Sequence, residues 1–91
     1  MNTVDWLSRL IAFDTTSRHS NLQLIDCVDE YLRGLGLQPW RAWNADQSKA
    51  NLFVTLPAHD GSIAGGTVLS GHTDVVPVDG QQWTSDPFQA D

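Results

Sequence analysis

The sequence is poor in cysteine and has no long hydrophobic run, and both shortages narrow the kind of protein that it encodes. Cys27 is the single cysteine among 91 residues, so no disulfide can form within the chain, which fits a reducing compartment. No apolar stretch approaches the length of about 20 residues that is needed to cross a bilayer. Residues 1–6 carry neither the basic start nor the apolar core of a signal peptide. We therefore expect a cytoplasmic protein that does not contact membranes.

Positive charge is also scarce, which argues against nucleic acid as a partner. The five Lys and Arg residues are outnumbered by 11 Asp and Glu residues, and the formal net charge is −6. The basic residues occur singly along the chain, at Arg9, Arg18, Arg33, Arg41 and Lys49. Binding to nucleic acid requires clustered basic side chains that neutralise phosphates, and the sequence contains no such cluster. What the chain does contain is an apolar fraction of 41%, which is typical of a folded globular domain.

Two helices are expected in the first part of the chain. Apolar residues at helical spacing predict one helix over residues 3–13, with Thr3 as its N-cap. A polar loop follows this helix. Ser20 and Gln23 have the spacing of a capping box, which predicts that the second helix begins at Ser20.

The second helix has two further features in its sequence. Asp29 and Arg33 form an i,i+4 pair of opposite charges in the more favourable orientation. Gly34 and Gly36 follow the apolar stripe, and glycine is common at the C′ position just beyond a helix. We therefore expect this helix to end at the glycines, with Gly36 at C′.

After the glycines the apolar pattern changes to that of strands. Residues 37–43 predict one strand, which Pro39 assigns to a sheet edge because proline cannot donate a ladder hydrogen bond. Residues 51–56 predict a second strand that ends at Pro57, and residues 67–70 predict a third. The expected order is helix, helix, strand, strand, strand, an α/β arrangement whose helices cover one face of the sheet. Because nothing in the chain can cover the other face, we expect a piece of a larger domain.

The third expected strand leads into the most informative residues of the chain, His72 and Asp74. Alternate residues of an extended segment point to the same side, so this imidazole and carboxylate would lie together at the C-terminal end of a strand. Open α/β sheets place their ligands there, and a metal-binding histidine usually donates its other ring N–H to a carboxylate or a carbonyl. His72 is therefore a candidate metal ligand, with Asp74 as its partner. In the structural alternative, both residues only end the strand and hydrogen-bond the following loop.

Other functional assignments have less support. His19 and His59 lie in polar loops without ligand-spaced neighbours, so we expect both to be exposed to solvent. Ser17 with a histidine would suggest a serine hydrolase, but the sequence has no Gly-x-Ser-x-Gly elbow. The glycines of residues 61–66 are not followed by the Gly-Lys-Ser/Thr of a phosphate-binding loop.

The segment around His72 also resembles a known signature. Leu69–Pro77 is similar to the first metal-binding motif of the zinc-dependent amidohydrolase and exopeptidase family. Trp83–Phe88 resembles the continuation of that motif, and Leu7–Ser17 and Asn51–Leu56 resemble the family's N-terminal helix and the strand before the motif. The residues of these segments most resemble the branch of the family that converts N-acetylornithine to ornithine and acetate. Desuccinylases and metallo-carboxypeptidases of the same family are alternatives, and so is a non-catalytic fragment.

This resemblance implies a fold, a cofactor and roles for two residues. His72 would be a zinc ligand, and Asp74 would be the catalytic carboxylate that orients it. Residues 1–91 would form the N-terminal portion of a three-layer α/β/α zinc-peptidase-like catalytic domain, without the remainder of that domain and without the lid or dimerisation domain. The parent enzyme would hold two zinc ions (or cobalt), act on a small N-acyl amino acid in arginine biosynthesis, and form a homodimer. The family's other ligands and its general base are not matched within this sequence, so we expect the chain alone to be inactive.

Overall fold

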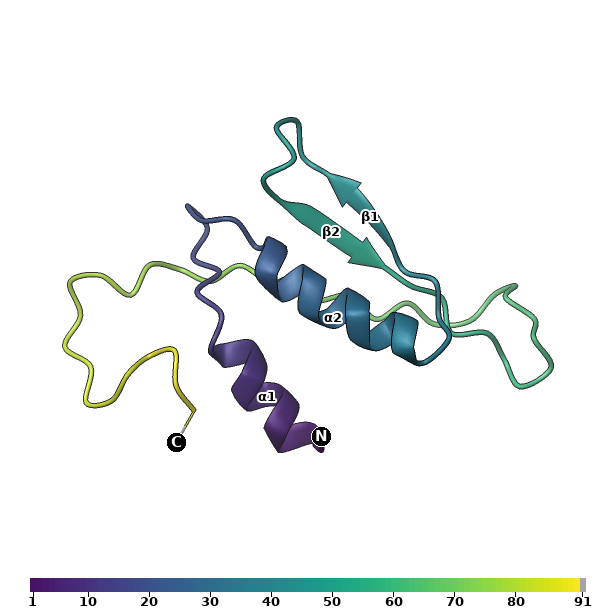
Figure 1. Cartoon of the computed structure of the whole chain (residues 1–91), viewed down its shortest axis with the longest axis horizontal. Helices are drawn as coiled ribbons and strands as arrows, with labels where there is room; N and C mark the ends of the chain where they lie inside the picture. The colour runs from purple at the N-terminus through teal and green to yellow at the C-terminus, as the bar shows by residue number, and fades with distance from the viewer. Residues whose placement is uncertain (91) are drawn as a thin grey trace.

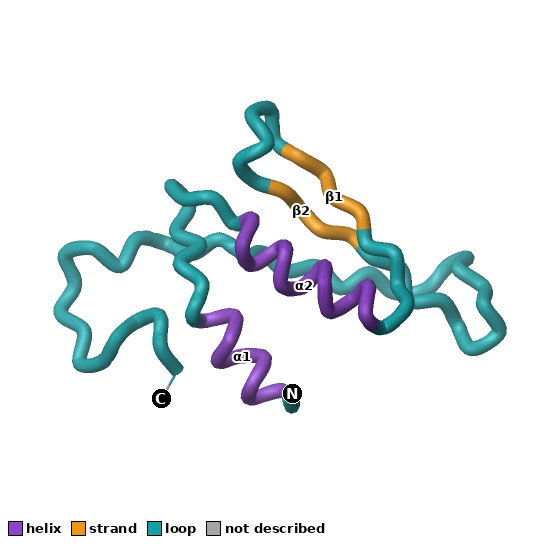
Figure 2. Tube along the Cα trace, viewed as in Figure 1, coloured by secondary structure: helices purple, strands orange, loops and turns teal. Residues whose placement is uncertain are grey.

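The computed structural model describes residues 1–90, which contain two helices followed by two strands. The elements are α1 (Thr3–Ile11), α2 (Leu22–Gly34), β1 (Trp40–Trp43) and β2 (Ala50–Phe53). The hairpin of β1 and β2 lies along one side of α2, while the segment after residue 66 runs behind α2 and then arches past α1 (Figure 1). Much of the chain is loop, above all after β2 (Figure 2). The expected mixed α/β class is confirmed.

The N-cap of the first helix lies one residue before the expected cap, and the helix begins at Thr3. Asn2, not Thr3, is the N-cap, because its backbone is extended and its Oδ1 accepts a hydrogen bond from the Asp5 N–H at 2.9 Å. The Asp5 carboxylate accepts in return from the Asn2 N–H at 3.2 Å, which completes a capping box. The helix ends at Ile11, short of the predicted residue 13, because the Phe13 N–H turns back to the Leu10 carbonyl. An Asn can therefore satisfy the first turn where Thr3 was expected to do so.

The start of α2 also differs from the expectation. The helix begins at Leu22, and the predicted capping box of Ser20 and Gln23 is wrong, because Ser20 Oγ accepts from the Leu22 N–H at 3.1 Å instead. Asn21 is the N-cap but makes no side-chain cap, because its amide pairs with the Ala50 backbone at 2.9 and 3.1 Å. The polar groups at this helix end therefore fasten α2 to the hairpin.

The C-terminal end of α2 follows the prediction. Gly36 has a φ of +84° and lies at C′, where the left-handed conformation costs a residue without Cβ little. Its N–H donates to the Arg33 carbonyl at 3.0 Å, and the Leu37 N–H donates to the Leu32 carbonyl at 3.1 Å. These two bonds make a Schellman motif, which directs the chain from α2 into the hairpin.

Replacing each of two neighbouring glycines by alanine should shift stability in opposite directions. Gly36→Ala is expected to lower the free energy of unfolding by about 1–2 kcal/mol, because alanine resists a positive φ. Gly34→Ala is the matched control: it lies in the last helical turn with open space around its Cα, and should raise stability by about 0.5–1 kcal/mol. Urea unfolding followed by circular dichroism measures both values. Changes of the same sign would contradict this account of the helix end.

The two strands form an antiparallel hairpin that buries one face against α2. The register pairs Trp40 with Phe53 and Trp43 with Ala50, so both predicted strands exist but are shorter than expected. The buried core consists of Leu24, Ile25 and Ala50. The opposite face remains open, since Trp40 and Phe53 are about half exposed with their ring centroids 5.6 Å apart. The sheet is therefore covered on one side only.

The expected third strand is the clearest correction. Residues 67–70 form no strand, and the side chains of Val68 and Leu69 are 78% and 93% exposed. A strand needs a neighbour whose N–H and C=O groups pair with its own, and no other strand of residues 1–90 supplies that pairing here. The apolar composition of the segment was read correctly, but its pairing was not.

A few contacts attach α1 to α2. The rings of Trp6 and Tyr31 meet edge to face with centroids 4.6 Å apart. Arg9 Nε donates to Cys27 Sγ at 3.1 Å, so the single cysteine is a free thiol facing a basic side chain.

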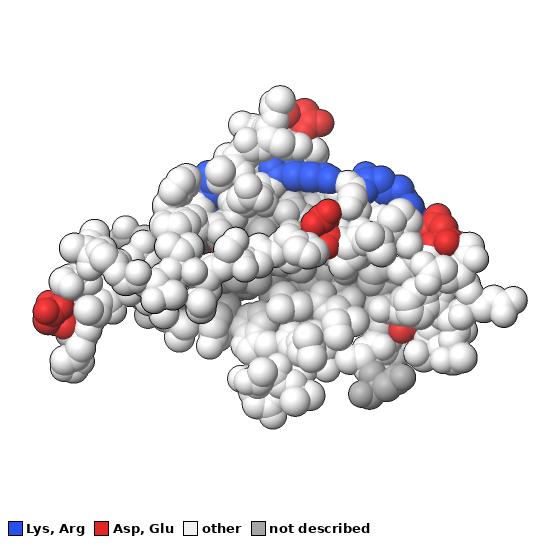
Figure 3. Space-filling view, turned by 180° about the vertical axis from the view of Figure 1, so that it is seen from behind, with Lys and Arg blue, Asp and Glu red and all other residues white. Residues whose placement is uncertain are grey.

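None of the helices in residues 1–90 has the length and apolar character required to span a bilayer. Seen from behind, the basic side chains form a narrow row across the molecule and not a broad surface (Figure 3).

Candidate metal-ligand site

The turn between the two helices is built around Asp14. Its Oδ1 accepts from both the N–H and the hydroxyl of Thr16, at 3.1 and 2.6 Å, and its Oδ2 lies 3.8 Å from His19 Nε2. Hydrogen bonds from Thr16 lower the pKa of the Asp14 carboxyl, with smaller contributions from His19 and Arg18. Thr16 itself is 1% exposed. The conformation of the turn is therefore stabilised by contacts among its own residues.

This turn holds the segment that carries the candidate site. The Val75 N–H donates to the Thr15 carbonyl and the Ser17 N–H donates to the Val75 carbonyl, both at 3.1 Å, which gives a short parallel bridge at Thr16 and Val75. The Thr15 hydroxyl donates to the Thr73 carbonyl at 2.6 Å, and Asn21 Nδ2 donates to Thr73 Oγ1 at 3.2 Å. The two neighbours of Asp74 in the chain, residues 73 and 75, are therefore both held by hydrogen bonds.

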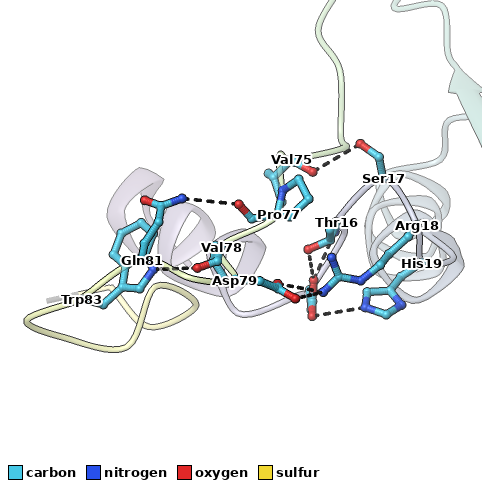
Figure 4. Close-up of polar contacts among 11 residues, drawn as sticks. Thr16, Ser17, Arg18, His19, Val75, Pro77, Val78, Asp79, Gln81 and Trp83 are labelled. Carbon is cyan, nitrogen blue, oxygen red and sulfur yellow. Dashed lines mark hydrogen bonds and ion pairs between the residues drawn. The ribbon is translucent and has the colours of Figure 1, made fainter.

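A second contact joins the same two segments further along the chain. The Arg18 guanidinium binds both carboxylate oxygens of Asp79, at 2.9 and 3.2 Å, and this pair faces the turn in Figure 4. The hydrogen bond from Arg18 and its positive charge lower the pKa of the Asp79 carboxyl. Beyond it, Trp83 Nε1 donates to the Val78 carbonyl at 3.2 Å (Figure 4). The loop that begins at residue 75 is therefore joined to the turn at Val75 and again at Asp79.

His72 and Asp74 come together as their spacing predicts. His72 Nδ1 lies 3.0 Å from Asp74 Oδ1 and 2.9 Å from the Asp74 carbonyl oxygen. Both of these oxygens can only accept, so Nδ1 carries the proton, and in the neutral ring Nε2 keeps its lone pair. The His72 side chain is 85% exposed, so that lone pair can be reached from solvent. Strand geometry does not bring the two residues together here, because neither lies in a strand.

The other oxygen of Asp74 is also occupied. Ser17 Oγ donates to Asp74 Oδ2 at 2.9 Å. This hydrogen bond is the largest influence on Asp74 and lowers the pKa of its carboxyl, and the hydrogen bond and charge of His72 add to it. Asp74 therefore stays ionised and accepts from a hydroxyl on one side and an imidazole on the other.

An imidazole prepared in this way has the donor chemistry of a zinc ligand. Zinc binds neutral imidazole nitrogen, and a carboxylate on the opposite ring nitrogen fixes the tautomer and raises the basicity of the ligand. His72 Nε2 is available for that role. Within residues 1–90, no cluster of three or more His, Cys, Asp or Glu side chains could hold a metal ion. The described chain therefore offers one oriented ligand.

The surroundings of His72 are hollow on two sides. A cavity of about 860 Å³ lies between α2, the hairpin and residues 70–74. A second, more apolar cavity of about 680 Å³ lies between the two helices and the segment that ends at Phe88. His72 lines both of them. The other two histidines lie elsewhere: His19 faces Asp14, and His59 is exposed in the turn after β2.

The sequence did not reveal the residues that support this pair. The sequence suggests only the role of a nucleophile for Ser17, and no pattern distinguishes Thr15 or Asn21. Ser17 and Asp74 are separated by 57 positions, so no local spacing links them. The one available signal was the run of hydroxyl residues Thr15–Ser17 shortly after α1, in the segment that resembles the family's N-terminal turn.

A histidine whose Nδ1–H is held by a carboxylate and whose Nε2 is open makes a candidate metal-ligand site, and sequence comparison finds enzymes among the relatives of the chain. Acetylornithine deacetylase of Proteus mirabilis is 41% identical over 81 residues, and that of Erwinia tasmaniensis is 40% identical over 81 residues; each alignment covers 85% of this chain. The enzyme of the same name from Shigella sonnei is 37% identical over 73 residues, or 76% of the chain.

The similarity is therefore to acetylornithine deacetylase, over a limited part of that enzyme. The chain spans 19% of the length of the Proteus and Erwinia relatives and 17% of the Shigella relative. No family model matches the chain, and no solved structure matches it.

Proposed function

We propose that the full-length protein containing this segment is a zinc-dependent amidohydrolase that converts N-acetylornithine to ornithine and acetate. The observation that carries the proposal is the His72–Asp74 pair, because the contact holds the imidazole as a zinc-binding histidine is usually held, within the segment most similar to the metal-binding signature. The names of the relatives support the choice of substrate.

Residues 1–91 would contribute the N-terminal portion of a three-layer α/β/α catalytic domain. The open face of the hairpin and the exposed Val68 and Leu69 are surfaces that further strands of such a domain would cover. Given a neighbouring strand, residues 67–70 would gain the ladder that they lack in this structure. The remaining zinc ligands and the general base would come from the same added segments, and the full-length enzyme would be a homodimer in the cytoplasm.

In the proposed enzyme, the residues of this chain would bind zinc and orient the imidazole that holds it. His72 would hold zinc through Nε2, and Asp74 would keep the imidazole in the Nδ1–H tautomer throughout turnover. When bound, the zinc ions lower the pKa of a water molecule and polarise the amide carbonyl of the substrate. The cavities on both sides of His72 give room for the acyl amino acid and for the protein segments that complete the site.

Comparison of three substrates, N-acetylornithine, N-succinyl-diaminopimelate and a peptide, tests this proposal. The full-length protein, loaded with zinc, should have a higher kcat/KM for N-acetylornithine than for N-succinyl-diaminopimelate. Initial rates of amine release measure both constants under the same conditions, with enzyme stripped of metal as the control. A preference for the succinylated substrate would favour a desuccinylase, and release of an amino acid from a peptide would favour a carboxypeptidase. Absence of hydrolysis of all three would contradict the proposed function.

A further inference from the structure

We propose that Ser17 is a positioning residue for the candidate zinc ligand, acting through the carboxylate of Asp74. The inference rests on the proposed function and deepens it, because it assigns to the turn between α1 and α2 the control of His72. The chain of contacts runs from Ser17 Oγ to Asp74 Oδ2 at 2.9 Å, and from Asp74 Oδ1 to His72 Nδ1 at 3.0 Å. Each carboxylate oxygen thus has its own donor.

The hydroxyl of Ser17 can serve two acceptors, and the carboxylate is the better one. Its oxygen lies 2.9 Å from Asp74 Oδ2 and 3.3 Å from the Val75 carbonyl oxygen. A hydroxyl has one proton, and an ionised acceptor forms the shorter and stronger hydrogen bond. The single donated bond therefore goes to Asp74, whose carboxylate it holds on the side away from His72.

Ser17 is itself held in place by its backbone. Its N–H donates to the Val75 carbonyl at 3.1 Å, and its carbonyl accepts from the ammonium group of Lys49. Thr15 and Asn21 donate their hydrogen bonds to Thr73 and not to the Asp74 carboxylate. Among residues 1–90, Ser17 and His72 are thus the side chains that hydrogen-bond Asp74.

Two contacts are needed to fix a carboxylate next to an exposed imidazole. With His72 alone, the Asp74 carboxylate could rotate about its Cβ–Cγ bond, because that torsion has broad minima. The Nδ1–H would then keep only the neutral Asp74 carbonyl oxygen, 2.9 Å away, which is a weaker acceptor than the carboxylate. The tautomer with the proton on Nε2, which lacks the lone pair that binds metal, would therefore become more populated. Ser17→Ala should therefore weaken zinc binding by about 10-fold. This is the lower end of the 10–100-fold loss that is typical when a group supporting a metal ligand is removed.

The tautomer of His72 in the metal-free 91-residue chain tests the inference without relying on activity. Ring ¹⁵N chemical shifts of labelled histidine, recorded at a pH where the imidazoles are neutral, report which nitrogen carries the proton. In the unmodified chain, His72 should be mainly the Nδ1–H tautomer, and the exposed His59 provides an internal reference. Ser17→Ala should shift His72 toward the distribution of His59, and Ser17→Thr, which keeps the hydroxyl, should restore it.

Ser20→Ala is the matched control, since the Ser20 hydroxyl contacts the Leu22 N–H and not the site. It should leave the His72 shifts unchanged. Identical His72 shifts in the Ser17→Ala variant and the unmodified chain would overturn the inference, as would failure of Ser17→Thr to restore them. The proposed function fails separately: a full-length protein that does not hydrolyse N-acyl amino acids would leave the tautomer result intact. Conversely, an active deacetylase with an unchanged tautomer in Ser17→Ala would reject only the role of Ser17.

Discussion

Replacing His72 by alanine in the full-length enzyme is expected to lower kcat/KM for N-acetylornithine by more than about 100-fold, beyond the loss typical of residues that only support a metal ligand. The physical reason is that His72 would supply a zinc-binding nitrogen, while Asp74 would act only by holding the ring. Asp74→Asn should therefore give a smaller loss, about 10–100-fold. Steady-state rates, together with the zinc content of each variant, measure the effect.

The other two histidines provide matched controls for this prediction. His19→Ala and His59→Ala remove the same side chain from exposed positions away from the site. Each should leave kcat/KM within about a factor of two, as surface substitutions usually do. If His72→Ala retained the activity of His59→Ala, His72 would not be a zinc ligand.

The second large effect is expected on stability, from Asp29. Its carboxylate lies almost buried between α2 and β1, where it accepts from Arg33 Nε at 2.5 Å and from Arg41 Nε at 3.1 Å. Burial would raise the pKa of Asp29, but the hydrogen bonds from the two guanidinium groups outweigh it and keep the pKa below its ordinary value. Asp29→Ala leaves Arg41, with its side chain only 19% exposed, without this partner. We expect a loss of about 3 kcal/mol in the free energy of unfolding.

A neighbouring carboxylate separates burial from charge in this prediction. Asp26 binds the same guanidinium of Arg41 at 2.7 Å, but its side chain is 65% exposed. Asp26→Asn should therefore cost less than about 1 kcal/mol, the usual limit for an exposed ion pair. Urea unfolding of the two variants measures the difference. Equal losses would show that burial of Asp29 between α2 and β1 does not determine its contribution.

The features that the sequence predicted correctly depend on residues close together in the chain. The pairing of Asp29 with Arg33 needs only helical spacing, and Gly36 at C′ needs only the local conformation of a helix end. The contact between His72 and Asp74 is also local, since only Thr73 lies between them in the sequence. Short-range geometry of this kind is set by backbone stereochemistry, which a sequence pattern carries.

What the sequence did not predict depends on distant partners. Residues 67–70 have the composition of a strand, but a strand also requires a neighbour to pair with. The N-cap of α2 is Asn21, not the predicted Ser20, and the side chain of Asn21 does not cap the helix because it pairs with Ala50, 29 positions away. Ser17 was missed for the same reason, because its partner Asp74 is reached only after the chain has folded back.

The position of zinc in the full-length enzyme tests most directly whether His72 is a zinc ligand. Diffraction data collected at the zinc absorption edge locate the metal by its anomalous signal, independently of the protein phases. We expect a zinc ion about 2.0–2.1 Å from His72 Nε2, with Asp74 on the opposite ring nitrogen and outside the coordination sphere. A zinc ion bound elsewhere without contact to His72, or bound through Nδ1 with Asp74 turned away, would contradict it.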